Sequence, residues 1–106
     1  MDIGSAVQAL KNGLMVKREG WDEDMFIFRQ VPTLVDKVIV PVMTSLPHSV
    51  KCEFERRINA VDSPISGIDY SNQIALVQQG NMVTAYSPTI IDLLAEDWDV
   101  YGEANP

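Results

Sequence analysis

The sequence has few of the residues that build reactive centres and metal sites. It contains one cysteine, Cys52, and one histidine, His48, in 106 residues. A single cysteine excludes an internal disulfide and a multi-cysteine zinc site. We expect Cys52 to be a small buried residue of a helix, as free cysteines usually are, and His48 to be an exposed residue at a helix start. No nucleophile accompanies the histidine in a recognisable pattern, so the sequence predicts no catalytic residue, no cofactor and no metal.

Positive charge is also scarce. Lysine and arginine together number 8, aspartate and glutamate 15, and the formal net charge is −7. An acidic surface repels a polyanion, so this balance argues against long nucleic acid as a partner. A small anionic ligand is compatible with it, because such a ligand responds to a local pocket more than to the charge of the whole molecule.

Long apolar runs are missing as well. The uninterrupted apolar stretches are only a few residues long, so we expect no membrane-spanning segment and no membrane partner. The first residues have neither a basic region nor a long apolar stretch, so we expect no signal peptide and a cytoplasmic location. The length predicts one domain over 1–106. So small a domain buries a modest fraction of its surface, which favours association.

The spacing of apolar residues predicts two helices. Residues 3–12 and 48–60 carry apolar side chains at helical spacing. Asp2 or Ser5 is suited to cap the first helix, and Gly13 can end it in a left-handed conformation. Both helices are therefore expected to place one apolar face against a core.

The second half of the chain predicts a hairpin and a short third helix. Gly80 and Asn81 separate two apolar runs, which is typical of a two-residue hairpin turn. The third helix is expected to begin with Ser87 as its cap and Pro88 in its first turn, and to run to about Glu96.

The remaining segments predict an antiparallel sheet. Pro41 places the run 35–42 at a sheet edge, as a strand or an extended arm. We expect 62–71 to be a loop and 102–106 a polar tail. The other predicted strands are 14–18, 25–31, 73–79, 82–86 and 98–101. Together these elements predict an α+β fold: a mostly antiparallel sheet of about five strands with an N-terminal helix, a middle helix and a short C-terminal helix.

A motif near the start of the chain favours a binding surface. Arg18 stands close to Gly20 and Trp21 in a turn between two predicted strands. An aromatic ring beside a guanidinium can seat a nucleobase and its phosphate, because bases stack on flat rings and arginine binds phosphate through two hydrogen bonds. The alternative is that Trp21 only covers the edge of the sheet.

A second motif surrounds the last predicted helix. Tyr86 is another flat ring, and its alternative place is the core with the hydroxyl in water. Ser87 offers a hydroxyl at a helix start, where unpaired backbone amides attract anions. Asp92 and Glu96 are four residues apart, so they either converge or form a solvated face. Trp98 is expected in the core or at an interface.

The same motifs carry a family resemblance over nearly the whole chain. The matching stretches are Ala9–Gly13 with Val16, Arg18, Gly20 and Trp21, then Met43–Pro47 with Val50 and Lys51, then Asp92–Trp98. They resemble the Thoeris anti-defence 2 (Tad2, also DUF2829) family of bacteriophage proteins. The resemblance implies a protein that is not an enzyme. It implies that the chain sequesters cyclic nucleotide immune signals without degrading them: glycocyclic ADP-ribose, which would block Thoeris immunity, and cyclic dinucleotides, which would block CBASS immunity.

The resemblance also implies a homotetramer in the host cytoplasm, with ligand pockets at subunit interfaces. Tyr86 stands where many members have tryptophan, and Ser87-Pro88 stands where they have Ala-Ser, so the ligand need not be the same. The ligand-binding residues that the resemblance implies are Trp21 and Tyr86 for base or ribose, Arg18 and Arg57 for phosphate, and Ser87, Thr89 and Asp92 for ribose hydroxyls or the base edge.

Two other functions stay open on the residues alone. A direct protein–protein inhibitor of a bacterial immune effector is compatible with the acidic surface. A hydrolase of the signal is the weaker alternative, because histidine–nucleophile and metal-ligand patterns are missing from the sequence.

Overall fold

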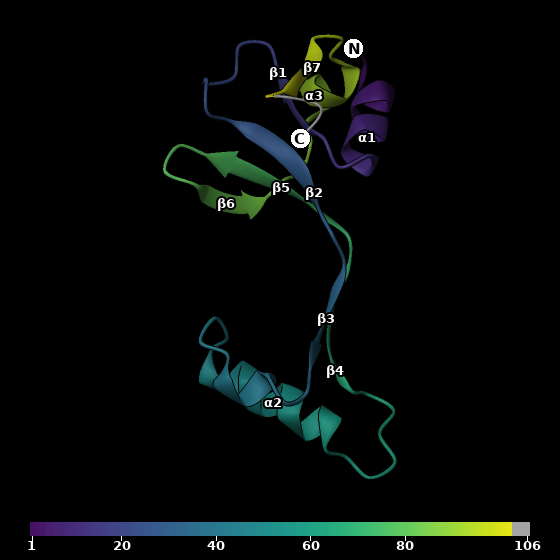
Figure 1. Ribbon diagram of the computed structural model, residues 1–106, viewed down its shortest axis with the longest axis vertical. Coiled ribbons are helices and arrows are strands. Elements are labelled where there is room, and N and C mark those ends of the chain that lie inside the picture. The colour runs from purple at the N-terminus through teal and green to yellow at the C-terminus, as the bar shows by residue number, and fades with distance from the viewer. Residues whose placement is uncertain (103–106) are drawn as a thin grey trace. The chain divides into compact units, whose positions relative to one another are not determined.

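The computed structural model describes residues 1–102, so the polar tail expected over 102–106 lies almost wholly outside the described residues. Two compact units make up the chain (Figure 1). The first unit combines residues 1–31 with the chain from residue 72 onward, and the second comprises residues 32–71. Within the described residues, no helix has the length and apolar character that crossing a membrane requires.

The observed elements confirm the α+β fold class. In chain order they are α1 (Ile3–Lys11), β1 (Met15–Arg18), β2 (Phe26–Gln30), β3 (Thr33–Asp36), the 3-10 helix η1 (Val40–Val42), α2 (His48–Ile58), β4 (Gly67–Tyr70), β5 (Gln73–Gln78), β6 (Met82–Ala85), α3 (Ile90–Leu94) and β7 (Trp98–Tyr101).

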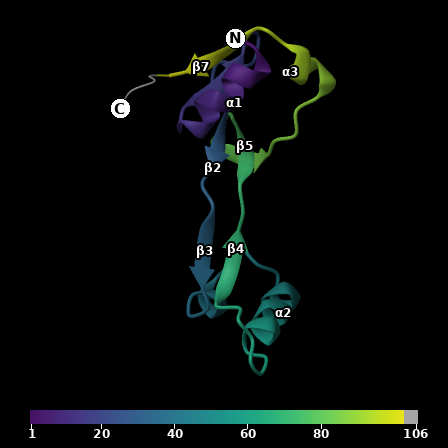
Figure 2. The same ribbon diagram turned by 90° about the vertical axis from the view of Figure 1, so that its right-hand side faces the viewer.

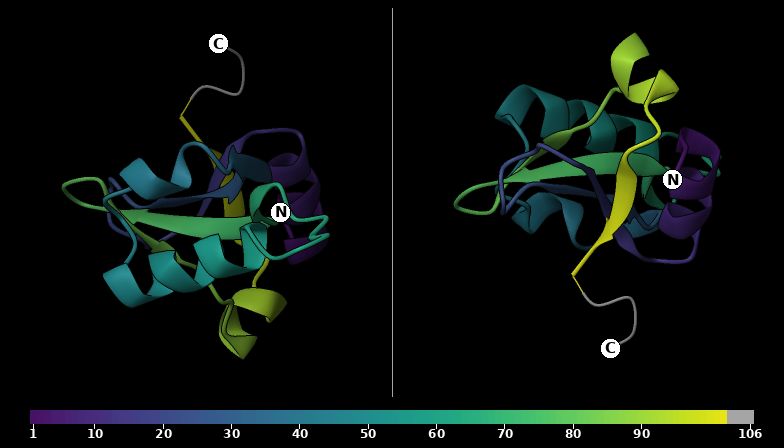
Figure 3. Two further views of the ribbon diagram at one scale, coloured as in Figure 1. Left: turned by 90° about the horizontal axis from the view of Figure 1, so that it is seen from below. Right: turned by 90° about the horizontal axis from the view of Figure 1, so that it is seen from above.

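A five-stranded sheet with the order β6-β5-β2-β1-β7 forms the first unit, and every neighbouring pair of strands is antiparallel. Val16 of β1 lies opposite Ile27 of β2, and both side chains are buried. The apolar face of α1 adds Ala6 and Leu10 to this core, and Figure 3 shows α1 next to β7. Trp98 of β7, with an exposed fraction of 1%, completes the core.

Local signals explain where α1 and the β5–β6 hairpin begin and end. Asp2 caps α1, because its carboxylate accepts a hydrogen bond from the Ser5 amide at 2.9 Å. After α1, Gly13 adopts a φ of +83°, which glycine tolerates without strain. The hairpin turn has positive φ at both Gly80 and Asn81, the geometry that suits the twist of the two strands. All three features match the sequence-based expectation.

An antiparallel pair, β3 with β4, forms the second unit together with η1 and α2 (Figure 2). Val35 of β3 lies opposite Ile68 of β4. The core of this unit is built on Val40, Ile58 and Ile68. Figure 2 shows β3 and β4 side by side along their length.

Three predictions about the second unit were wrong. The run 35–42 is not one extended element, because β3 ends at Asp36 and Pro41 lies within η1. The expected loop 62–71 contains β4, whose pairing with β3 outweighs its weak local preference for a strand. Cys52 is exposed rather than buried. It is two residues from Phe54, and such a step turns a helical side chain to nearly the opposite face.

The third helix also differs from the prediction. Thr89 rather than Ser87 is its cap: the Thr89 hydroxyl accepts from the Asp92 amide at 3.1 Å, and the Asp92 carboxylate accepts from the Thr89 amide at 3.1 Å. This reciprocal capping box satisfies amides that a helix start leaves unpaired. The helix therefore begins at Ile90 and ends at Leu94.

Two glycine-to-alanine substitutions should have opposite effects on stability. In Gly67→Ala the new Cβ would collide with the backbone carbonyl of Val35, so the β3–β4 pair should open and the melting temperature should fall. In Gly4→Ala the new Cβ makes only an ordinary contact with Asp2. Alanine is the better helix former, so this change within α1 should raise the free energy of unfolding by up to about 1 kcal/mol. Thermal unfolding measures the stability of both variants, and amide hydrogen exchange over β4 measures whether the β3–β4 pair opens in Gly67→Ala. Unchanged exchange in β4 of Gly67→Ala would contradict the assigned register.

Candidate ligand-binding site

Three aromatic rings gather at the edge of the first unit's core. Trp21 lies in the turn after β1, and its ring centroid is 6.0 Å from that of Tyr86 and 5.4 Å from that of Trp98. The interplanar angles are 63° and 77°, so both contacts are edge-to-face, an arrangement that aromatic quadrupoles favour. Trp21 and Tyr86 are half-buried against the core, whereas Trp98 is inside it, as expected.

The carboxylate of Asp92 joins these rings to charged groups. It accepts hydrogen bonds from the Tyr86 hydroxyl at 2.7 Å, from Nη1 of Arg18 at 3.1 Å and from the Thr89 amide at 3.1 Å. Its own backbone carbonyl accepts from Nε1 of Trp98 at 3.0 Å. Asp92 is 9% exposed, so the alternative of a solvated acidic face is wrong for this residue. One carboxylate thus fixes two side chains, those of Arg18 and Tyr86, and the backbone at the start of α3.

Arg18 is held on its other side by Asp97. Its Nε donates to Oδ1 of Asp97 at 2.9 Å and its Nη2 to Oδ2 at 3.3 Å, a two-pronged bond that fixes the guanidinium plane. With Asp92 included, one cation faces two anions, and the local charge of this group is negative. Arg18 keeps further N–H groups that these bonds do not use.

The hydrogen bonds hold each group in one protonation state near neutral pH. Burial by itself raises the pKa of Asp92, but bonds from Tyr86, Thr89 and Arg18 outweigh burial and bring it below the usual range. The Arg18 guanidinium lowers the pKa of Asp97. Burial, and then the Asp92 carboxylate, raise the pKa of Tyr86 far above its usual value. The arrangement therefore offers fixed hydrogen-bonding groups rather than an acid or base poised near neutral pH.

The structure gathers most of the predicted site residues and leaves two outside the hydrogen-bonded group. Ser87 is exposed in the connection between β6 and α3. Arg57 belongs to the second unit, where its Nε donates to Glu53 at 2.7 Å. Arg56 also bonds Glu53, and hydrogen bonds from these two arginines lower the pKa of Glu53 to about 2. The predicted residues that lie together are Arg18, Trp21, Tyr86, Thr89 and Asp92. With Asp97 and Trp98 they form a cluster that we call the Asp92 group.

Two members of the group were absent from the predicted site. Asp97 holds Arg18, and Trp98 packs on Trp21 and bonds the Asp92 carbonyl. Both follow from strand pairing, because Arg18 of β1 lies opposite Trp98 of β7 and Asp97 is its neighbour. The opposite charges of Arg18 and Asp97 in the two end motifs were the signal in the sequence. Among residues 1–102, no cluster of three or more histidine, cysteine or acidic residues could hold a metal ion.

A hollow of about 700 Å³ borders the Arg18–Asp97 pair. Lys17 and Tyr101 also line it, but neither Trp21 nor Tyr86 does. The two half-buried rings therefore lie outside the walls of this hollow.

A family model and a known protein match this sequence over nearly its whole length. A family model described as "Thoeris anti-defense 2-like domain" (Tad2-like) matches residues 1–101. A protein of Bacillus phage SP01 named "Thoeris anti-defense 2" is 31% identical over 101 residues, which cover 94% of this chain and 93% of that protein.

The Asp92 carboxylate should stabilise the protein in a pH-dependent way. Its pKa and that of Asp97 are depressed in the folded state, so their contribution is complete above the ordinary value of 3.8 and is lost as the pH falls through the folded values. Asp92→Asn should lower the free energy of unfolding by about 2 to 3 kcal/mol near neutral pH, because Arg18 loses a charged partner. Urea unfolding of the parent and of Asp92→Asn should show the difference between their free energies of unfolding narrowing from about pH 6 to about pH 3.

The matched control is Asp99→Asn on the exposed side of β7. The hydrogen bond that the structure gives its carboxylate is a local one to the Val100 amide, so the free energy should change by no more than about 0.5 kcal/mol. A gap between Asp92→Asn and the parent that stays constant over the whole pH range would refute the assigned ionisation.

Proposed function

The chain belongs to the Thoeris anti-defense 2 family, and we propose that it counters Thoeris immunity in the host cytoplasm by binding a cyclic nucleotide signal without degrading it. Glycocyclic ADP-ribose is the first ligand to test. A cyclic dinucleotide is the second, and its capture would extend the activity to CBASS immunity. The observation that supports the proposal is the group in which Asp92 holds Tyr86 and Arg18 beside Trp21.

The required affinity decides what the site must contain. A protein that removes a signal must bind it below its working concentration, and nanomolar binding corresponds to about −12 kcal/mol. Stacking on an aromatic ring contributes about 1–3 kcal/mol per base, so Trp21 and Tyr86 supply only part of this. Charge-assisted hydrogen bonds in an enclosed cleft must supply the rest.

The charges of the Asp92 group suggest that different residues bind different parts of the ligand. Two carboxylates surround Arg18, so a phosphate placed against them meets repulsion as well as attraction. We therefore assign Asp92 to ribose hydroxyls or the base edge, with Thr89 and Ser87 beside it, and Arg18 chiefly to positioning Asp92. Further cations must neutralise the phosphates, and Arg57 is the residue that the family resemblance offers for this.

The protonation states favour binding over hydrolysis. Asp92 and Asp97 are held ionised and Tyr86 is held neutral. A hydrolytic mechanism needs a group that exchanges a proton near neutral pH, and none of these three is suited to it. This supports a non-catalytic protein that keeps its ligand intact.

An exposed apolar helix supports assembly with further copies of the chain. On α3, Ile90, Ile91 and Leu94 are 75%, 70% and 76% exposed. Apolar side chains gathered in this way mark contact surfaces, and Asp92 lies on the same helix. A second copy seated on α3 would lie next to the Asp92 group and would add side chains around a ligand there, which fits the proposed homotetramer with pockets between subunits.

Trp21→Ala should weaken ligand capture about tenfold to hundredfold, because it removes a stacking surface. The protein is incubated with glycocyclic ADP-ribose, free ligand is removed by filtration, and heat releases the bound molecule for mass spectrometry. The parent protein should release the ligand unchanged. Trp21→Phe is the matched control, since it keeps a flat ring and should keep much of the capture.

Each alternative function predicts a different result in this assay. Released material with an altered mass would indicate a signal-degrading hydrolase. Capture of a host effector protein without any nucleotide would indicate direct protein–protein inhibition. Equal capture by the parent and by Trp21→Ala would show that Trp21 is not part of the site.

Charge placed on the exposed face of α3 should dissociate the assembly. Ile91→Glu and Leu94→Glu each put a carboxylate into an apolar contact, where an unpaired charge is strongly unfavourable, so the mass in solution should fall toward that of the single chain. Sedimentation or light scattering measures it. Val61→Glu is the control, because Val61 is 92% exposed in the second unit. A parent protein of single-chain mass would refute the assembly.

A further inference from the structure

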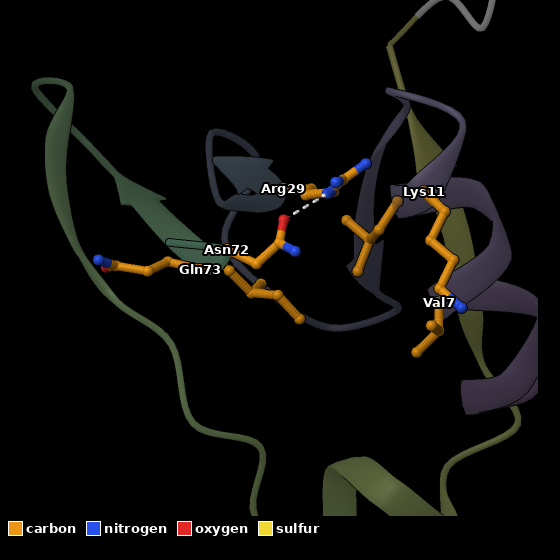
Figure 4. Close-up of a pocket in the computed structure, with 7 residues that line it drawn as sticks. Val7, Lys11, Arg29, Asn72 and Gln73 are labelled. Carbon is orange, nitrogen blue, oxygen red and sulfur yellow. Dashed lines mark hydrogen bonds between the residues drawn. The ribbon is translucent and has the colours of Figure 1, made fainter. Parts of the chain in front are cut away.

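A second hollow of the first unit is separate from the group around Asp92. Its volume is about 530 Å³, within the range of small-molecule pockets. Helix α1 forms one side and strands β2 and β5 the other. Figure 4 shows Val7 and Lys11 on one side and Asn72 on the other, while the side chain of Gln73 points away from α1. Its lining shares no residue with the Asp92 group or with the hollow beside Arg18.

The base of this hollow is apolar. Leu10 is almost fully buried in the core, and Val7 and Ile74 are half-buried beside it. These branched aliphatic side chains offer a surface for the apolar body of a ligand, because covering them removes apolar area from water.

Positive charge surrounds the base. Lys11 and Arg29 line the hollow, and no acidic residue does. In the part of the chain that the structure describes, the salt bridges involve Arg18, Arg56 and Arg57 but neither Lys11 nor Arg29. Lys17, Lys37 and Lys51 are likewise outside these salt bridges, so what distinguishes Lys11 and Arg29 is their place beside an apolar surface.

A neutral amide positions one of these cations. Nε of Arg29 donates to Oδ1 of Asn72 at 3.0 Å (Figure 4). An amide orients the guanidinium without neutralising it, so the remaining N–H groups of Arg29 keep their full attraction for an anion.

We propose that this hollow binds a small organic anion, an aromatic or aliphatic body that carries one sulfonate, carboxylate or phosphate group. The body would lie on Val7, Leu10 and Ile74, and the anionic group would bond Arg29 and Lys11. This site is independent of the proposed capture of cyclic nucleotides, since it uses none of the same side chains.

The test uses 8-anilinonaphthalene-1-sulfonate, whose fluorescence rises on binding, and the uncharged N-phenyl-1-naphthylamine as its partner probe. The sulfonate should bind saturably and shift the backbone amide signals of residues 7–11 and 72–74. The double variant Lys11→Gln/Arg29→Gln should bind it about tenfold more weakly. Lys37→Gln/Lys51→Gln removes the same amount of charge elsewhere and should change the affinity less than about twofold. The uncharged probe should bind equally to the parent and to Lys11→Gln/Arg29→Gln.

A filling variant separates the hollow from other apolar surfaces. Val7→Phe places a ring in the space while Lys11 and Arg29 remain, and it should block the sulfonate. Equal weakening in the two double variants would overturn the proposal, because it would show that only net charge matters. Amide shifts confined to the exposed apolar residues of α3, or the absence of saturable binding, would overturn it as well.

Discussion

The hydrogen-bonded carboxylate of Asp92 is the interaction on which the site depends. A buried carboxylate is unfavourable unless donors replace the water that it loses, and here Tyr86, Thr89 and Arg18 provide them. The helix α3 has only five residues, too few to be stable by itself. Its capping box and the bond from Nε1 of Trp98 to the Asp92 carbonyl attach it to the sheet. Loss of this one carboxylate would therefore disturb the Tyr86 ring, the Arg18 guanidinium and the start of α3 together.

The hydrogen bonds that stabilise the Asp92 group also limit which ligand groups it can bind. Arg18 lies between Asp92 and Asp97, so its geometry is fixed but much of its charge is neutralised. A fixed guanidinium loses little conformational entropy when a ligand arrives, whereas a neutralised one attracts phosphate only weakly. The balance makes Asp92 more valuable as an acceptor for hydroxyl and amino groups. Phosphates depend on cations that are less neutralised than Arg18, such as Arg57, which shares the single carboxylate of Glu53 with Arg56. The two kinds of ligand group thus need different parts of the protein.

The parts of this fold that could be predicted are those that local sequence determines. Apolar spacing indicated α1 and α2, and Gly80-Asn81 indicated the β5–β6 hairpin. The strand β4 was missed, because its pairing with β3 is a contact distant in sequence that few local residues announce. The cap of α3 was misplaced for another reason: Ser87 and Thr89 are both suitable caps, and only the Thr89–Asp92 spacing distinguishes them. In the site, Arg18, Trp21, Tyr86 and Asp92 were named from the two end motifs and lie together, whereas Asp97 required knowledge of the β1–β7 register.

The position of Asp92 on α3 couples ligand binding to assembly in the proposed mechanism. Asp92 points into the hydrogen-bonded group, while Ile90, Ile91 and Leu94 of the same short helix are exposed. A copy that covers these apolar residues would also restrain the helix that carries Asp92. By linkage, a ligand that binds only the restrained form must strengthen the assembly by the same free energy with which the assembly strengthens ligand binding. A homotetramer would then be a condition of tight capture, because only the assembly would hold α3 in the form that binds the ligand.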